Sequence, residues 1–114
     1  MNHAIQDKSF RFAVRIVNLC RYLQTEQKEY ILTKQLLRCG TSIGANVAES
    51  QQAQIRADFI SKLNIALKES CETDYWLRLM YETQYLTSEE FQSIIVDCHE
   101  IEKLLISIIK SLKE

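Results

Sequence analysis

The stretch GTSIGANVAES, residues 40–50, decides how this chain folds. It contains both glycines of the chain, mostly small side chains, and no charge before Glu49. Such a composition is typical of a loop, yet the flanking segments LTKQLLRC and QQAQIRADF favour helix. A glycine inside a helix costs about 1 kcal/mol relative to alanine, so a helical stretch needs compensation. We expect that compensation to be close packing, because the small side chains leave a smooth surface for another backbone.

Length and composition restrict the fold class. The chain has 114 residues, of which 46% are apolar and 25% charged, as in an ordinary soluble domain. It has two glycines and no proline, which is too little turn chemistry for the reversals of a β-sandwich or barrel. We therefore expect a single all-α domain over residues 1–114.

Apolar periodicity predicts four helices, at about residues 9–24, 33–53, 57–85 and 88–112. Ser9 and Thr33 are the predicted N-caps of the first and second helices. Thr87 and Glu90 have the spacing of a capping box at the start of the fourth. Four amphipathic helices with short connections predict an antiparallel, up-down-up-down four-helix bundle with crossing angles of roughly 20°.

The third and fourth predicted helices carry more apolar surface than one antiparallel neighbour covers. The fourth repeats apolar residues in an almost uninterrupted heptad from Phe91 to Leu112, with further aliphatic residues beside it. Monomers seldom expose large contiguous apolar patches. We therefore expect a homo-oligomer.

The sequence gives no sign of export or of membrane insertion. The first residues, MNHAIQDKSF, are polar and charged, and no later apolar run is long enough to span a bilayer. The four cysteines lack CxxC spacing and are interpreted as reduced thiols. We expect a cytoplasmic protein.

Basic side chains of the first two predicted helices are the candidate nucleic-acid-binding residues. The net charge is −1, but residues 1–38 hold seven Lys or Arg against three acids. Lys8, Arg11 and Arg15 recur at helical spacing and form a basic stripe, which Lys34 and Arg38 extend. An oligomer would repeat these cations and so bind a polyanion more tightly. The alternative is a solvated helix face.

A polar line on the second predicted helix is the candidate structural network. Ser42, Asn46 and Glu49 fall at i, i+4 and i+7 and share one face, and Glu72 is available from the third helix. Polar groups inside a bundle must be paired, and once paired they fix the register of the helices. We expect these four residues to belong to one buried hydrogen-bonded network between the two helices.

Catalytic and metal-binding patterns are weak. The carboxylates Glu49, Glu72 and Asp74 could form an acid–base pair or a two-metal site, but the sequence lacks the Glu-x-x-His motifs of di-iron bundles. His99 stands beside Cys98 without the three or four ligands that zinc requires. No P-loop, nucleophile elbow or dinucleotide-binding glycine pattern is present. We expect no enzymatic activity, no metal and no cofactor.

The run SIGANVAES, residues 42–50, resembles the Ser-Ile-x-x-Asn-Ile-Ala-Glu-Gly run of a bacterial four-helix bundle family, with Ser50 in place of the usual glycine. That family includes proteins encoded within intervening sequences of large-subunit ribosomal RNA genes and the accessory protein of diversity-generating retroelements. The likeness extends through DFISKLNIALKESCETDYWLRLM to YLTSEEF, and so over most of the chain. It implies an antiparallel bundle that assembles into a ring, typically a pentamer, with no assigned enzymatic activity.

The resemblance also bears on partners. For the retroelement members it implies a strongly basic surface that binds nucleic acid and a reverse transcriptase, whereas the present chain has a net charge of −1. The sequence is therefore consistent with two functions. One is a non-enzymatic oligomeric scaffold that binds RNA, DNA or a nucleic-acid enzyme such as a reverse transcriptase through the basic stripe. The other is a pure protein-interaction module whose basic stripe is merely solvated.

Overall fold

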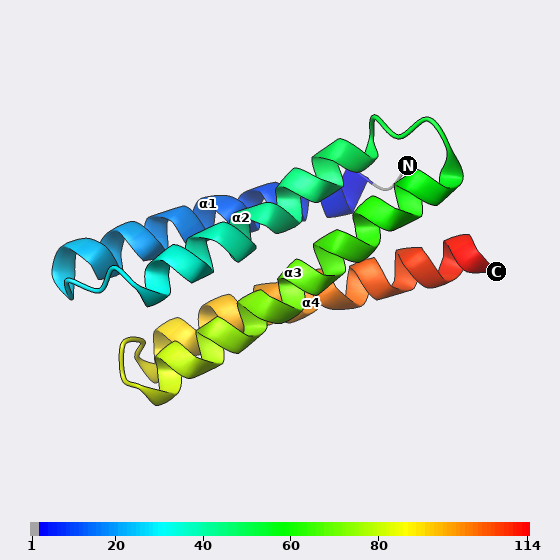
Figure 1. The fold of residues 1–114 in the computed structure, drawn as a ribbon. Helices are drawn as coiled ribbons and strands as arrows, with labels where there is room; N and C mark the ends of the chain where they lie inside the picture. The colour runs from blue at the N-terminus through cyan, green and yellow to red at the C-terminus, as the bar shows by residue number, and fades with distance from the viewer. Residues whose placement is uncertain (1–2) are drawn as a thin grey trace.

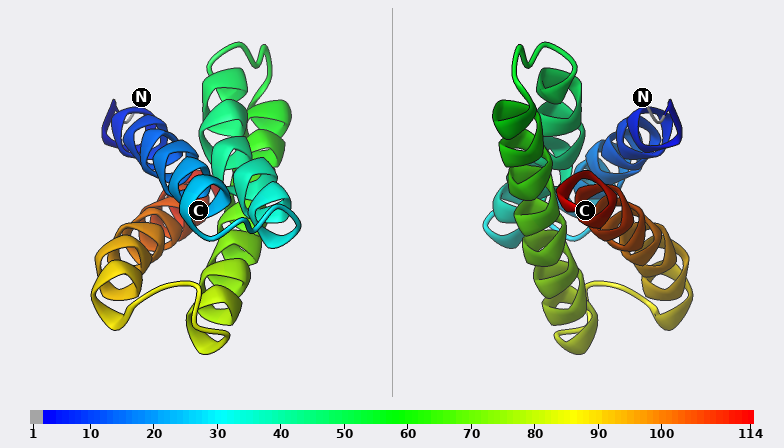
Figure 2. Two further views of the ribbon diagram at one scale, coloured as in Figure 1. Left: turned by 90° about the vertical axis from the view of Figure 1, so that its left-hand side faces the viewer. Right: turned by 90° about the vertical axis from the view of Figure 1, so that its right-hand side faces the viewer.

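The computed structural model describes residues 3–114 and contains four helices joined by short turns (Figure 1). Their bounds are α1 His3–Glu26, α2 Leu32–Ser50, α3 Arg56–Glu82 and α4 Ser88–Lys113. Consecutive helices run in opposite directions, so the predicted up-down-up-down bundle is confirmed. Each helix packs against its neighbours in sequence, and α1 also contacts α4, which closes the bundle (Figure 2). None of the described helices combines the length and the apolarity needed to cross a membrane.

The core draws on one face of every helix. The fully buried large side chains are Ile5, Phe12, Ile16, Leu23, Leu36, Ile43, Val47, Leu63, Leu77, Met80, Ile101 and Leu105. Two polar residues of α3 inside this core bond within their own helix: the hydroxyl of Ser70 donates to the carbonyl of Leu67 at 2.7 Å, and that of Thr73 to the carbonyl of Glu69 at 2.7 Å. The polar centre of α3 therefore needs no partner from a facing helix.

The stretch GTSIGANVAES, residues 40–50, is helical throughout, and its glycines lie where α2 touches α1. A Cβ at Gly44 would lie 3.1 Å from the backbone oxygen of Ser9. A Cβ at Gly40 would lie 2.8 Å from both γ carbons of Ile16. The predicted close approach is thus confirmed, because a larger side chain at either glycine would collide with α1.

The start of α1 was placed wrongly by the sequence pattern. The helix begins at His3, and the predicted N-cap Ser9 lies buried within it, with its hydroxyl 3.3 Å from the carbonyl of Gln6. Ile5 is completely buried seven residues before Phe12, on the same helix face. Burial of this isoleucine extends the helix through a segment whose polar residues concealed the period.

The α1–α2 turn contains a cap that the sequence did not reveal. Helix α2 begins at Leu32, and the carboxylate of Glu29 accepts from the backbone N–H groups of Ile31, Leu32 and Thr33 at 3.2, 3.0 and 2.8 Å. The predicted N-cap Thr33 instead donates its hydroxyl to the carbonyl of Glu29. At its other end α2 stops at Ser50, three residues before the predicted limit.

The α3–α4 turn combines two standard helix-end motifs. Helix α3 ends at Glu82, not Tyr85, because Gln84 adopts a left-handed conformation (φ 71°) and the N–H of Tyr85 bonds to the carbonyl of Met80 at 2.9 Å. The predicted capping box then starts α4. Its two bonds are Glu90 N–H to the Thr87 hydroxyl, at 3.1 Å, and Thr87 N–H to the Glu90 carboxylate, at 2.8 Å.

Candidate nucleic-acid interface

The five candidate cations do not share one surface. Lys8 and Arg15 reach from α1 toward α4, whereas Arg38 reaches from α2 toward α3. The α1–α4 and α2–α3 interfaces lie on opposite sides of the bundle (Figure 2). Arg11 and Lys34 are exposed on α1 and α2. Helical spacing groups residues on one helix, but the arrangement of neighbours decides which cations meet.

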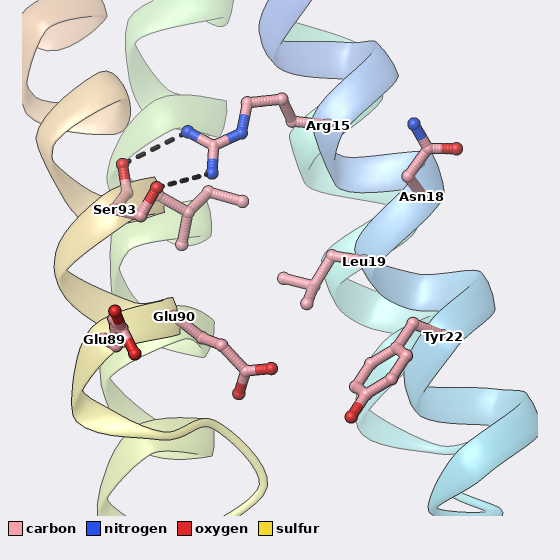
Figure 3. Close-up of a pocket in the computed structure, with 8 residues that line it drawn as sticks. Arg15, Asn18, Leu19, Tyr22, Glu89, Glu90 and Ser93 are labelled. Atoms are coloured by element: carbon pink, nitrogen blue, oxygen red, sulfur yellow. Dashed lines mark hydrogen bonds between the residues drawn. The ribbon is translucent and has the colours of Figure 1, made fainter.

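Lys8 and Arg15 both pair with carboxylates of α4. Lys8 forms an ion pair with Glu100. The guanidinium of Arg15 donates to the carbonyl and the hydroxyl of Ser93 at 3.1 and 2.9 Å (Figure 3). It also donates to the carboxylate of Asp97 at 2.6 Å. These four charged side chains are 40–49% exposed, so water screens their attraction and each pair contributes about 0–1 kcal/mol.

Two of the other three cations are paired as well. Arg38 bridges Glu69, at 3.1 Å, and Glu72. The hydrogen bond from Arg38, together with one from the indole of Trp76 at 3.0 Å, lowers the pKa of the Glu72 carboxyl below its ordinary value. Arg11 pairs with Asp7 at 3.2 Å within α1.

Lys34 is the exception among the five candidates. It is exposed and forms no ion pair with any residue of the described range 3–114. The predicted stripe is therefore a set of internally neutralised pairs with one open cation, and phosphate would have to compete with carboxylates for the rest.

The predicted polar network forms separate pairs instead of one buried cluster. The side-chain amide of Asn46 donates to the backbone carbonyl of Ser42 at 2.8 Å, within α2. Glu49 is exposed and pairs with Lys62 of α3 at 3.2 Å, while Glu72 pairs with Arg38. The expectation of a single buried network was wrong, because Asn46 bonds within α2 while the two glutamates pair with long cationic side chains at the edge of the α2–α3 interface.

The three carboxylates considered for catalysis do not converge. Glu49 and Glu72 are engaged as described, and Asp74 lies between Arg78 and His99, 3.0 Å from each. Within residues 3–114, no group of three or more His, Cys, Asp and Glu side chains is placed to hold a metal ion. Burial raises the pKa of the Cys20 thiol to about 12 and that of Cys39 to about 11, so both are protonated at neutral pH.

A groove lies between the C-terminal half of α1 and the first turns of α4 (Figure 3). Its volume is about 540 Å³ and its surface is mostly apolar. Leu19, Tyr22 and Ile94 supply the apolar part, and Glu89 and Glu90 stand on its α4 side. The groove exists because α1 and α4 contact each other less than any other neighbouring pair of helices.

Helical spacing did not predict that Lys8 and Arg15 pair with acids of α4, although the distribution of charge along the chain indicates it. Residues 1–38 carry four more cations than acids, whereas residues 86–114 carry three Lys or Arg against six acids. In a closed four-helix bundle the first and last helices are neighbours. An excess of opposite charge on those two helices therefore predicts ion pairs between them, and the Lys8–Glu100 and Arg15–Asp97 pairs are of this kind.

Comparison with known proteins agrees with the resemblance seen in SIGANVAES. The family model described as 23S rRNA-intervening sequence protein matches residues 1–107. A similar solved structure is that of a protein with unknown function from the S23 ribosomal protein family of Bacteroides thetaiotaomicron VPI-5482. The two chains are 63% identical, with a TM-score of 0.92, over 93% of this chain and 98% of that chain. No curated protein matches. The chain belongs to the 23S rRNA-intervening sequence protein family.

Proposed function

We propose that this protein is a non-enzymatic scaffold that acts by assembling with copies of itself and with protein partners. The supporting observation is its exposed apolar surface. Large apolar side chains stand in solvent on α1, α3 and α4 and on two of the connecting turns; they are Phe10, Val14, Tyr22, Tyr30, Ile31, Ile55, Ile65, Tyr75, Val96 and Ile106. Phe10, Ile31 and Ile55 are 69%, 78% and 66% exposed. Assembly would remove such surface from water, at about 25 cal/mol for each Å².

The pairing of the basic residues favours protein contacts over nucleic-acid contacts. Lys8, Arg11, Arg15 and Arg38 each have a carboxylate partner within the same chain. Affinity for a polyanion grows with the number of phosphates that are neutralised, and internal pairing reduces that number. A net charge of −1 adds no general attraction.

The proposal includes no enzymatic role, because the candidate catalytic carboxylates are already paired and the buried thiols are protonated. Asp74, Glu72 and Glu49 are each engaged in ion pairs at separate points along α2 and α3. The buried thiols of Cys20 and Cys39 carry raised pKa values and are poor nucleophiles at neutral pH.

The mass of the purified protein in solution tests the proposal. Light scattering after size exclusion, at micromolar protein, is expected to give a multiple of the 13.4 kDa chain, and a ring of five is the number suggested by the family resemblance. Assembly through apolar surface should survive 1 M salt, where the Debye length is about 3 Å. A monomer at all concentrations and salt levels would overturn the proposal.

Nucleic-acid binding is a second candidate, favoured by one observation. Lys34 is exposed and unpaired within the described chain, and the exposed pairs of Arg11 and Arg15 are weak enough for phosphate to displace. A ring would repeat these groups. Fluorescence anisotropy with structured RNA and duplex DNA across a salt series tests it. Binding that falls steeply with salt and is abolished by Arg11→Glu with Arg15→Glu, at unchanged mass, would support it; no binding at low salt would exclude it.

A further inference from the structure

The α1–α2 turn presents a rigid apolar projection. Tyr30 and Ile31 are 58% and 78% exposed, and Ile31 is the more exposed of the two. The turn is held by Glu29, which is 8% exposed and whose carboxylate accepts three consecutive backbone N–H groups. A preorganised projection loses little conformational entropy when it binds, so its apolar contact is retained as affinity.

A positive charge accompanies this projection. Lys34 lies one helical turn after Ile31, is exposed, and makes no ion pair with another described residue. We refer to Tyr30, Ile31 and Lys34 as the turn patch. It would fit a surface that offers an apolar cavity beside carboxylates.

The α1–α4 groove has that character. Leu19, Tyr22 and Ile94 form an apolar lining, and Glu89 and Glu90 stand beside it (Figure 3). Glu89 is exposed and makes no ion pair with the described part of the chain. At about 540 Å³ the groove lies within the usual range of sites that bury a ligand, roughly 300–1,000 Å³.

We propose that the groove of one subunit receives the turn patch of a second copy. Ile31 would contact Leu19 and Ile94, and Lys34 would face Glu89. The inference rests on the proposed self-assembly and names the two surfaces that carry it. Charge complementarity selects the second copy as occupant, since the chain itself supplies an unpaired cation for the unpaired carboxylate.

The positions of the two surfaces suit a ring. Both lie at the same end of the bundle, where the side-chain amide of Gln27 donates to the carbonyl of Tyr85 at 3.0 Å and joins the two turns (Figure 2). Because the turn patch and the groove are different surfaces, the contact is head-to-tail. Head-to-tail contacts close into a ring when the rotation between subunits divides a full circle.

Two substitutions and two matched controls test the contact. Ile31→Glu places a carboxylate against the acidic side of the groove, and Glu89→Lys places a cation opposite Lys34. The control for the first is Ile55→Glu, which alters an isoleucine that is 66% exposed in the α2–α3 turn at the other end. The control for the second is Asp58→Lys, which alters an acid in the first turn of α3 as Glu89→Lys does in α4.

Light scattering is expected to show Ile31→Glu and Glu89→Lys as monomers, while both controls keep the wild-type mass. Circular dichroism melts check that every variant folds. Mixing the two monomeric variants should produce a 1:1 dimer, because the Glu89→Lys protein still has an intact turn patch and the Ile31→Glu protein an intact groove. An equal mixture that remains monomeric would overturn the head-to-tail pairing.

The possible failures are distinguishable. A monomeric wild-type protein would overturn the proposed self-assembly, and this inference with it. A wild-type oligomer whose mass is unchanged by both substitutions would overturn only the assignment of these surfaces. Controls that also dissociate would show that the interface lies elsewhere or is not confined to one end.

Discussion

Helix α1 is bound on its two sides by different kinds of interaction. Against α2 it meets Gly40 and Gly44, where the side chain of Ile16 and the backbone of Ser9 pack directly on the glycines. Against α4 it extends Lys8 and Arg15, and the helices are connected by long charged side chains with a groove beside them. The α1–α2 interface, which we call the tight interface, tolerates almost no added volume. The α1–α4 interface, which we call the loose interface, is adaptable and leaves a groove exposed.

The largest expected effect comes from adding volume to the tight interface. Gly44→Leu forces a side chain against the backbone of Ser9, which cannot move away as a side chain can, and should destabilise the bundle by about 3 kcal/mol or more. Urea denaturation followed by circular dichroism measures the loss. The neighbouring exposed Ala45→Leu is the control and should change stability by less than about 0.5 kcal/mol. Equal stability of the two variants would show that the helices do not touch at Gly44.

A double-mutant cycle tests the close contact between Gly40 and Ile16. Gly40→Ala gains about 1 kcal/mol of helix propensity but collides with Ile16, so alone it should destabilise. In an Ile16→Ala background the collision is gone and Gly40→Ala should stabilise. The expected coupling is about 2 kcal/mol, measured by urea denaturation of the four proteins. Additive effects would contradict the collision.

The stability contributed by the α1–α2 turn should depend on pH. Burial by itself raises the pKa of Glu29, but the N–H groups of Leu32, Thr33 and Ile31 outweigh it, and the folded-state pKa lies below the ordinary 4.5. The resulting stability is complete above pH 4.5 and is lost as the pH falls through the lower folded value. Glu29→Gln should therefore cost about 1 kcal/mol at pH 7.

The measurement is the difference in melting temperature between wild type and Glu29→Gln at pH 7 and at successively lower pH. The difference should shrink below pH 4.5, as protonation removes the charge from the wild-type side chain too. A difference that stays constant to the lowest pH would mean that the carboxylate charge contributes nothing to the cap.

The smallest effect is expected at the loose interface. Arg15→Ala and Asp97→Ala should each cost about 1 kcal/mol or less, since the pair is exposed and screened. The coupling energy from the corresponding cycle should fall further in 0.5 M salt. A coupling of several kcal/mol that is independent of salt would erase the contrast between the two interfaces.

The sequence predicted the fold because the fold depends on local periodicity. The apolar spacing located the four helices, and Thr87 with Glu90 located the start of α4, since a capping box involves only residues three apart. The predicted N-cap positions of α1 and α2, at Ser9 and Thr33, were wrong. There the helix limits depend on burial of Ile5 and on a glutamate cap that has no common sequence signature.

The candidate site was less predictable for a related reason. Helical spacing shows that Lys8, Arg11 and Arg15 share a helix, but the carboxylates that pair with Lys8 and Arg15 lie 92 and 82 positions away in the chain. Likewise the groove results from the divergence of α1 and α4. Neither helix contains a sequence pattern that predicts the groove between them.

The α3–α4 turn has a consequence for the order of folding. The left-handed Gln84, the bond from Tyr85 to Met80 and the capping box at Thr87 all join residues within a few positions of one another. Contacts of such short range close small loops and form early, whereas α1 and α4 can meet only after the rest of the chain is arranged. We therefore expect the α3–α4 hairpin to form before α1 meets α4: Thr87→Ala should slow refolding, and Asp97→Ala should mainly speed unfolding in stopped-flow experiments.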